Sequence, residues 1–333
     1  MAMDKSAADS YVYAKASGML AKSYVGNRSR TLFSFHTLQE LWSFLFKKEV
    51  PLVPESLLAR ALEQEAFDVF VENYRKLIDN YSDPQPILKA LLHSYDYENL
   101  KDIGASLALG EKEIPHVQKI VPFNIINYSK WPDLKAMTAD GPLAWYDKVP
   151  DIKLQHQINY KIDCQNVMEL WKALDVTESV CRKDIKKLFS EKFSLDNVVW
   201  AIRLRLYYNM EKEEIIPLLA YSNEEKSSKD PLVQDAIRSL DWPLDDYDSW
   251  KKWKHSALLN LHEDGVVWSV DPRWLSNAYR SVHVDRARRL FHQYPSTCCP
   301  LVSWFIIKQD ELDNIRTASE GIRLNINQEV NNG

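Results

Sequence analysis

The stretch DELDNIRTASEGIR, residues 310–323, has two counterparts earlier in the chain. They are DYENLKDIGASLALG, residues 96–110, and SLDNVVWAIRLRLYY, residues 194–208. All three can be aligned on one asparagine, with an apolar residue directly after it and a small polar or acidic residue three positions before it. The asparagines are Asn99, Asn197 and Asn314, and the earlier polar residues are Asp96, Ser194 and Glu311. Self-similarity at such a long period indicates an internal threefold repeat.

Apolar residues upstream of each asparagine extend the repeat. They stand twelve and eight positions before it, and this spacing of four places both on one helix face. The pairs are Ile87 and Leu91, Ile185 and Phe189, and Val302 and Ile306. A polar residue three positions before the asparagine is typical of a helix N-cap, whose oxygen accepts from a free N–H of the first turn. The pattern predicts, in each copy, an apolar-faced helix, a break and a second helix with this cap.

The composition favours a nearly all-α protein and excludes several function classes. Among 333 residues there are only 8 glycines, against a usual share of about 7%. Phosphate-binding loops need glycine because their backbone N–H groups must approach the phosphate closely, and neither GxGxxG nor GxxxxGK[ST] occurs. The formal net charge is −5, whereas nucleic-acid binders usually carry a basic surplus. We therefore expect no nucleic acid partner and no directly bound nucleotide.

Two proline-containing stretches divide the chain. Residues 121–151 contain four prolines, and residues 222–248 are polar, then rich in proline and acidic residues. Because proline interrupts helices, we expect three helical repeats with approximate boundaries. They are residues 1–120, 121–221 and 222–333, each with one copy of the motif.

Neither a metal site nor a membrane span is predicted. The four cysteines, Cys164, Cys181, Cys298 and Cys299, have no zinc-like spacing to histidines, so we interpret them as reduced packing residues. The first residues lack the apolar run of a signal peptide, and no stretch approaches the ~20 apolar residues of a transmembrane helix. We expect no metal and no cofactor.

Two short stretches leave alternatives open. LDDYD, residues 244–248, superficially resembles the Mg²⁺-binding acids of all-α prenyl-transferring enzymes, but no second acidic cluster accompanies it in the sequence, and a solvated acidic loop is the favoured interpretation. DSWKKWKHSALL, residues 248–259, could touch lipid headgroups or place its tryptophans in a core. An all-α Mg²⁺-dependent enzyme and an all-α adaptor or scaffold protein remain alternative functions.

The three repeat segments resemble a known family. Together with SYVYAKASGMLAKSYV, residues 10–25, they are similar to the internal repeats and first helix of the C subunit of archaeal and bacterial A/V-type rotary ATPases. The homologue in the eukaryotic vacuolar proton pump is known as its d subunit. The resemblance spans about Tyr11 to Gly321 and is strongest at KQDELDNIR and EGIR, residues 308–316 and 320–323.

The resemblance implies an all-α funnel of three similar helical lobes around a pseudo-threefold axis. A rotor shaft made of the D and F subunits would enter its mouth, and its other face would rest on the membrane ring of proteolipid subunits. The chain would be a non-catalytic central-stalk subunit, peripheral on the cytoplasmic face of the membrane. It would transmit torque for ion transport coupled to ATP hydrolysis or synthesis.

The same resemblance implies a basic residue two or six positions after each motif asparagine. Lys101 and Arg316 fill the first position, and Arg203 fills the second. We predict that these three line the socket for the shaft. The alternative is that such a residue, on a helix between apolar residues, ties two lobes together. The copies are not identical, because Ala105 and Glu320 stand where the second copy has Arg203.

Overall fold

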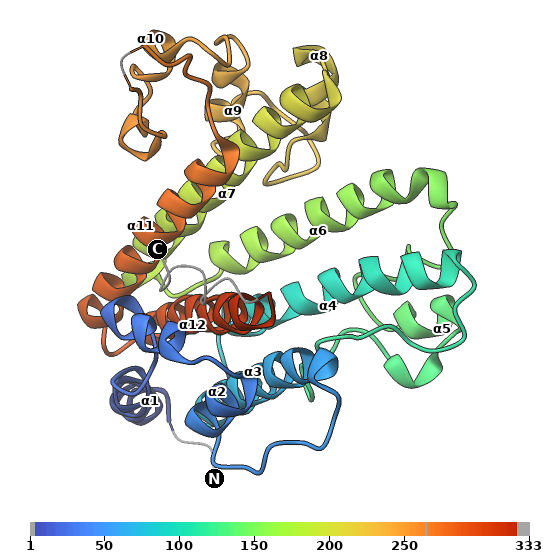
Figure 1. Ribbon diagram of the computed structural model, residues 1–333, viewed down its shortest axis with the longest axis vertical. Helices are drawn as coiled ribbons and strands as arrows, with labels where there is room; N and C mark the ends of the chain where they lie inside the picture. The colour runs from blue at the N-terminus through green and yellow to red at the C-terminus, as the bar shows by residue number, and fades with distance from the viewer. Residues whose placement is uncertain (1–3, 264, 325–333) are drawn as a thin grey trace. The chain divides into compact units, whose positions relative to one another are not determined.

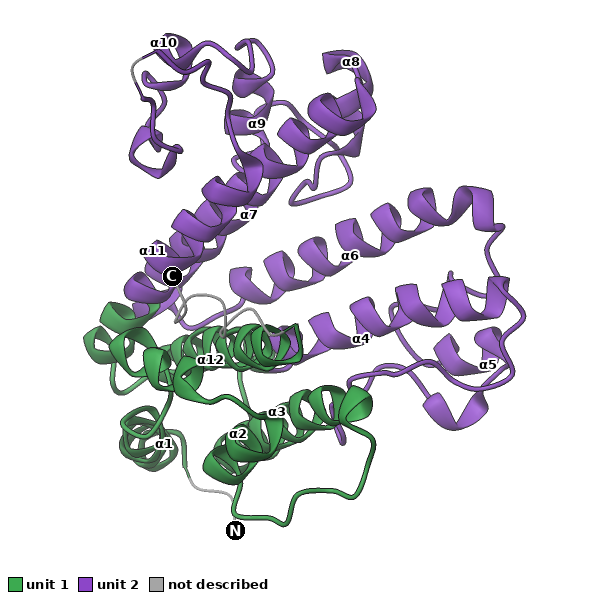
Figure 2. Ribbon diagram, in the orientation of Figure 1, with its two compact units in different colours: residues 1–88, 287–333 green, residues 89–286 purple. Residues whose placement is uncertain are grey.

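Helices account for the regular structure of the protein. The computed structural model describes residues 4–263 and 265–324 (Figure 1). Within these ranges every regular element is an α-helix or a 3₁₀ helix and no β-strand occurs, which confirms the all-α class. The chain divides into two compact units (Figure 2): residues 1–88 with 287–333, and residues 89–286. The division into three parts at residues 121 and 222 stays a prediction, as does the threefold funnel.

The first unit joins the two ends of the chain. The last helix, α12, packs against both the first helix, α1, and the long helix α3. The short helix α2 begins with a reciprocal capping box formed by Thr37 and Glu40. The elements of this unit are α1 (Lys5–Leu20), η1 (Gly26–Ser34), α2 (Leu38–Leu45), α3 (Glu55–Ile78) and α12 (Cys299–Arg323).

The second unit is built on long helices separated by irregular segments. Its long helices are α4 (Pro86–Ala108), α6 (Gln155–Asp175), α7 (Ser179–Tyr208) and α11 (Pro272–Gln293), of which α4 begins and α11 ends in the first unit. Between α4 and α6 lie η2 (Tyr128–Lys130), α5 (Leu134–Thr138) and η3 (Ile152–Leu154). Between α7 and α11 lie α8 (Lys212–Ile215), η4 (Ile216–Leu218), α9 (Gln234–Ser239), α10 (Tyr247–Trp250) and η5 (Ser256–Leu258).

Three hydrophobic cores have the same construction, and we call each a lobe. The first lobe consists of α4, the irregular segment after it and α6. The second consists of α7, its following segment and α11. The third consists of α12 and α3, but its irregular segment, residues 21–54, comes from the other end of the chain. Side chains Ile315, Ala318 and Ile322 of α12 pack there with Leu32 and Leu38 of that segment and with Leu58 and Leu62 of α3. The third repeat is therefore complete only when the N-terminal segment joins the last helix.

The predicted break and N-cap in each repeat are wrong. All six motif residues lie in the middle of α4, α7 and α12, each of which is one continuous helix. The physical reason is that the twelve residues before each asparagine contain neither glycine nor proline, so nothing ends the helix there. The predicted apolar face is confirmed, because all six upstream residues are buried, from Ile87 at 0% to Ile306 at 5% exposure.

The contacts of the two ambiguous stretches decide between their alternatives. Trp250 and Trp253 are buried in the core of the second lobe while the intervening lysines are exposed, so the core alternative is correct. In LDDYD, Asp246 caps α10 by accepting from Asp248 N and Ser249 Oγ, and Asp248 pairs with Lys251 at 2.5 Å. These acidic side chains have local structural partners, which supports the interpretation as an acidic loop.

Two further sequence expectations concern cysteines and membrane spans. None of the four cysteines, all of which lie in the described part of the chain, forms a disulfide, and three of them are buried. None of the helices in the described part of the chain combines the length and the apolar character that crossing a membrane requires.

A buried histidine makes the stability of the second lobe depend on pH. His283 of α11 packs against the Phe189 ring, and its Nδ1 lies 3.4 Å from the Tyr279 hydroxyl. Burial, helped by nearby Lys192, lowers the pKa of His283 to about 3. The unfolded chain takes up this proton below pH ~6.5 and the folded chain does not. Lowering the pH from ~6.5 towards 3 therefore lowers the free energy of unfolding, by up to about 1.4 kcal/mol per pH unit from this group.

We expect His283→Phe to remove this part of the pH dependence. Urea unfolding across the same pH window measures it, with exposed His156→Phe as the control. Identical pH slopes for His283→Phe and the unsubstituted protein would contradict the assignment.

Candidate functional site

The motif residues of the first lobe hold its irregular segment onto α4. Asn99 exchanges two hydrogen bonds with the backbone of Gln118: its Nδ2 donates to the carbonyl oxygen at 2.9 Å, and its Oδ1 accepts from the N–H at 2.9 Å. Asp96 accepts from Ile125 N at 2.6 Å and from the Tyr128 hydroxyl at 2.5 Å. Burial raises the pKa of Asp96, although these hydrogen bonds partly offset it. Two side chains of one helix thus satisfy the backbone of two loop positions.

The second lobe repeats the arrangement. Asn197 Oδ1 accepts from Ala220 N at 2.8 Å, and its Nδ2 donates to the carbonyl oxygens of Ala220 and Leu232 at 2.9 and 2.8 Å. Ser194 donates to the buried carboxylate of Asp235 at 3.1 Å. The asparagine has the same role as Asn99, and its partner again follows it in the chain.

In the third lobe the residue that holds the irregular segment is the one three positions before the motif asparagine. Glu311 Oε1 accepts from Tyr24 N at 2.6 Å, while its Oε2 pairs with Lys308. The Lys308 ammonium also donates to Ser23 Oγ at 3.2 Å. Asn314 is half-buried, and one of its contacts is a donation to Asp310 on the same helix at 3.4 Å. An acidic residue therefore holds the N-terminal segment in place where an asparagine holds the other two segments.

We call the contact of a motif side chain with a loop N–H a loop clamp. There are three such contacts, in which the donors are the backbone N–H groups of Gln118, Ala220 and Tyr24. These three N–H groups are partly buried. Backbone groups withdrawn from water need a partner, and irregular segments have no helix or sheet to pair them. The recurrence of the asparagine could be read from the sequence, but its partners could not, because no local pattern marks them.

Lys101, the first predicted socket residue, joins two helices of the first lobe. Its ammonium lies 2.8 Å from Asp163 Oδ1 on α6 and 2.7 Å from Glu98 Oε2 on its own helix. Burial acts to lower the pKa of Lys101, but the two carboxylates outweigh it and the pKa is raised. The ammonium of Lys101 is thus engaged within the chain.

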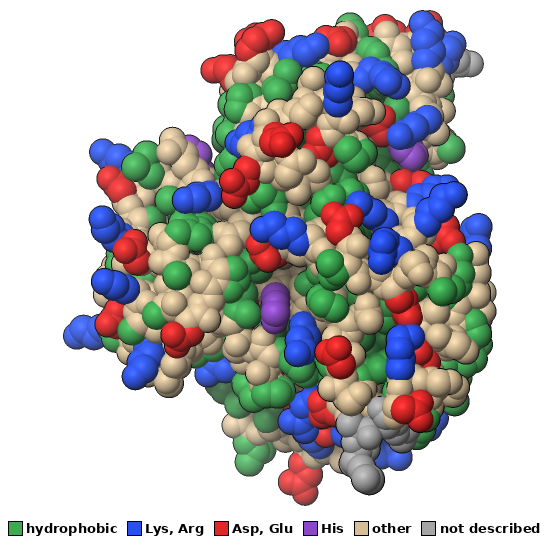
Figure 3. Space-filling model, turned by 180° about the vertical axis from the view of Figure 1, so that it is seen from behind, with side chains coloured by type: hydrophobic (Ala, Val, Ile, Leu, Met, Phe, Trp, Pro, Cys, Tyr) green, Lys and Arg blue, Asp and Glu red, His purple; other side chains and the backbone are tan. Residues whose placement is uncertain are grey.

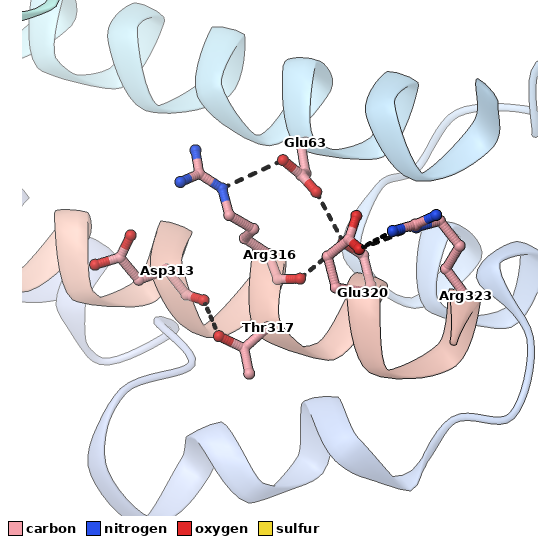
Figure 4. Close-up of polar contacts among 7 residues, drawn as sticks. Glu63, Asp313, Arg316, Thr317, Glu320 and Arg323 are labelled. Carbon is pink, nitrogen blue, oxygen red and sulfur yellow. Dashed lines mark hydrogen bonds and ion pairs between the residues drawn. The ribbon is translucent and has the colours of Figure 1, made fainter. Parts of the chain in front are cut away.

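Arg316 makes the corresponding pair in the third lobe. Its Nε lies 3.3 Å from Glu63 Oε2 on α3 (Figure 4). Ser319 donates to the other oxygen of Glu63 at 3.1 Å. Asp163 and Glu63 each directly follow a buried core residue, Ile162 or Leu62. We call α4, α7 and α12 the motif helices, and α6, α11 and α3 the returning helices of the same lobes. An ion pair between motif helix and returning helix therefore occurs in two lobes, which is independent support for the repeat.

Arg203 differs from the other two. It is half-buried on α7, and no ion pair of its guanidinium occurs among the described residues. The position that corresponds to Lys101 is Val199, which is buried in the core. Among the described residues, Arg203 differs from Lys101 and Arg316 in having no ion pair within the chain, although the Arg316 side chain is the more exposed.

One face of the molecule is of mixed charge. Figure 3 shows basic, acidic and apolar side chains interspersed over one face of the molecule. A nucleic-acid site gathers basic residues, and this face shows no such gathering.

The fold and these contacts define an all-α protein of three helix–loop–helix lobes, each closed by a side chain from the middle of a long helix. The comparisons with known proteins identify the family. The family described as "ATP synthase (C/AC39) subunit" matches residues 12–332. Because this match spans nearly the whole chain, the protein belongs to that family and is one of the subunits of the V- and A-type ATP synthase group.

A similar protein occurs in Treponema pallidum (strain Nichols). It is described as "Uncharacterized protein" and is 27% identical over 322 residues, which cover 97% of this chain and 94% of that protein. The two chains are therefore related along almost their whole length.

Removing the clamp of the second lobe should destabilise the protein. Asn197→Ala leaves the N–H and carbonyl of Ala220 and the carbonyl of Leu232 without this partner. An unpaired buried group costs about 1–3 kcal/mol. The Leu232 contact is buried and the two Ala220 contacts are partly buried, so we expect a loss of about 2–3 kcal/mol in urea unfolding. The exposed Asn223→Ala is the control and should change stability by less than about 0.5 kcal/mol. A loss below about 1 kcal/mol for Asn197→Ala would refute the clamp.

The buried pair in the third lobe should behave as a coupled unit. Lys308→Met leaves the Glu311 carboxylate buried without its cation, which typically costs about 3–5 kcal/mol. Adding Glu311→Gln removes the charge and keeps an acceptor for Tyr24 N, so the double variant should regain most of this loss. Lys172→Met, which breaks an exposed pair with Glu169, is the control. Urea unfolding decides, and a double variant as unstable as Lys308→Met would contradict the coupling.

Proposed function

We propose that this protein is the central-stalk coupling component of a V/A-type rotary ATPase. In this role it links the rotor shaft, made of the D and F subunits, to the membrane ring of proteolipid subunits. It has no active site of its own, binds no nucleotide, and transmits torque for ion transport coupled to ATP hydrolysis or synthesis. The observation that carries the proposal is the family match over residues 12–332.

The construction of the lobes supports a mechanical role. A protein that passes torque must be stiff, and close-packed helices deform little. In each lobe the irregular segment, which would otherwise be the most flexible part, is bonded to the middle of a long helix. The ion pairs of Lys101 and Arg316 add a second connection between motif helix and returning helix. These features suit a protein that is loaded from two sides.

The proposed location is the cytoplasmic face of the membrane, where the protein would be peripheral and held by its partners. Purification of the full-length tagged protein from native membranes tests the proposal. We expect the proteolipid ring and the shaft to copurify with it in fixed ratio. If it came alone, or only with proteins outside the ATPase, the proposal would fail.

For the shaft contact we propose a socket lined by Lys101, Arg203 and Arg316. Lys101 and Arg316 would face the shaft while each also pairs with a carboxylate of this chain. Because charge reversal adds repulsion against an acidic or carbonyl-rich partner surface, Arg203→Glu should weaken binding of the isolated shaft. Screening by salt makes the effect largest at low ionic strength. Lys187→Glu reverses an exposed charge on the same helix and is the matched control.

Binding of purified shaft to the immobilised protein at low and high salt measures the effect. Equal affinities of Arg203→Glu, Lys187→Glu and the unsubstituted protein at low salt would remove Arg203 from the socket. A circular dichroism melt of each variant shows whether it is folded.

A further inference from the structure

The first and second lobes have separate cores and are joined near both ends of helix α6. Both cores lie in the second compact unit (Figure 2) and have no residue in common. Near the carboxyl end of α6, Asp175 pairs with Lys186 of α7, whose ammonium lies 4.6 Å from the centre of the Trp171 ring. In the amino-terminal half of α6, Tyr160 contacts the irregular segment of the second lobe. At 1.5 Å per residue, residues 160 and 175 are about 22 Å apart along the helix.

The contact at Tyr160 is made by polar groups. Its hydroxyl lies 2.6 Å from the Pro217 carbonyl oxygen and 3.0 Å from that of Leu219, and it donates its one proton to this pair. The Lys226 ammonium lies 3.2 Å from the Pro217 carbonyl oxygen and 5.4 Å from the centre of the Tyr160 ring. We call these contacts the lobe latch. Because Tyr160 is half-buried and Lys226 is exposed, water competes for the same groups, and such hydrogen bonds contribute little net free energy.

The backbone at Lys226 is strained while the latch is closed. Its φ is 49°, in the left-handed region that residues other than glycine, asparagine and aspartate rarely adopt. The loop around it is closed by Asp230, whose carboxylate accepts from Ser222 N at 2.8 Å and from Ser222 Oγ at 2.7 Å. Strained backbone persists only where surrounding contacts enforce it. The contacts of the Lys226 side chain with Pro217 and Tyr160 help to enforce it, and their loss allows the strain to relax.

The other connection between the lobes is a short turn. Helix α6 ends at Asp175 and α7 begins at Ser179, so only residues 176–178 connect them. Changes of angle between rigid parts are absorbed by a few residues at the ends of elements. The pair of Asp175 with Lys186 lies beside this turn, so a change of angle alters it least. We propose that the lobe latch sets the angle between α6 and α7, and that its opening lets the first and second lobes rotate apart about residues 176–178.

The rotation needs no partner, so the purified full-length chain tests it separately from the proposed function. Spin labels are attached through p-acetylphenylalanine, which leaves the cysteines untouched, in place of exposed Asp102 on α4 and exposed Arg238 on α9. Pulsed electron–electron resonance then gives the distribution of distances between the two lobes. The unsubstituted latch should give mainly one distance.

Two substitutions open the latch. Tyr160→Phe removes the hydroxyl and keeps the ring, and Lys226→Met removes the ammonium and keeps most of the stem. In each we expect a second, longer distance, with the ratio of opened to latched chains raised about two- to tenfold, as the loss of one hydrogen bond predicts. The matched controls are Tyr207→Phe, an exposed tyrosine of α7, and Lys229→Met, an exposed lysine of the same loop. Both should keep the distance distribution of the unsubstituted latch.

Unchanged distances in both Tyr160→Phe and Lys226→Met would overturn the proposal. A distribution that only broadens about the same mean would place the motion within a lobe and would overturn the rotation as well. A longer distance in the control variants to the same extent would remove the latch as its cause. Circular dichroism melts show that each variant is folded, and if Tyr160→Phe is not, Lys226→Met at its exposed position decides alone.

Discussion

In each of the three lobes a partly buried backbone N–H of an irregular segment needs an acceptor, because a backbone donor that is withdrawn from water has to be paired. Asn99, Asn197 and Glu311 provide it from the middle of α4, α7 and α12. Because the acceptor sits mid-helix, the helix has to continue past the motif, with an apolar face before it and another after it. The long continuous helices, the folded loops and the common core pattern all depend on this contact.

The clamp also explains how segments from the beginning and the end of the sequence together form the third lobe. Two irregular segments follow their motif helices directly, whereas the third precedes its helix by most of the chain. Glu311 accepts from Tyr24, and Lys308 lies between Glu311 and Ser23. These contacts hold to α12 a segment that the chain joins directly to α3 but not to α12. The contact thus fixes this segment on the last helix of the third lobe.

The sequence predicts the repeat, the all-α class and the buried helix faces because these depend on spacing within one helix. Ile87, Ile185 and Val302 are examples, and all three are fully buried. It does not predict what the motif residues bind. The same residue types serve as helix caps or as tertiary hydrogen-bond partners, and Asn197 reaches Leu232, 35 positions away. The role of Lys101 was likewise hidden, because its partner Asp163 lies on another helix.

Hydrogen–deuterium exchange of the backbone amides of Gln118, Ala220 and Tyr24 tests the central claim most directly. These three N–H groups belong to irregular segments, where amides ordinarily exchange fast through local opening. We predict that all three exchange as slowly as amides in the middle of α4, α7 and α12. Rapid exchange at Tyr24, with protection at the other two, would show that the third lobe is not closed by Glu311. Rapid exchange at all three would contradict the clamp itself.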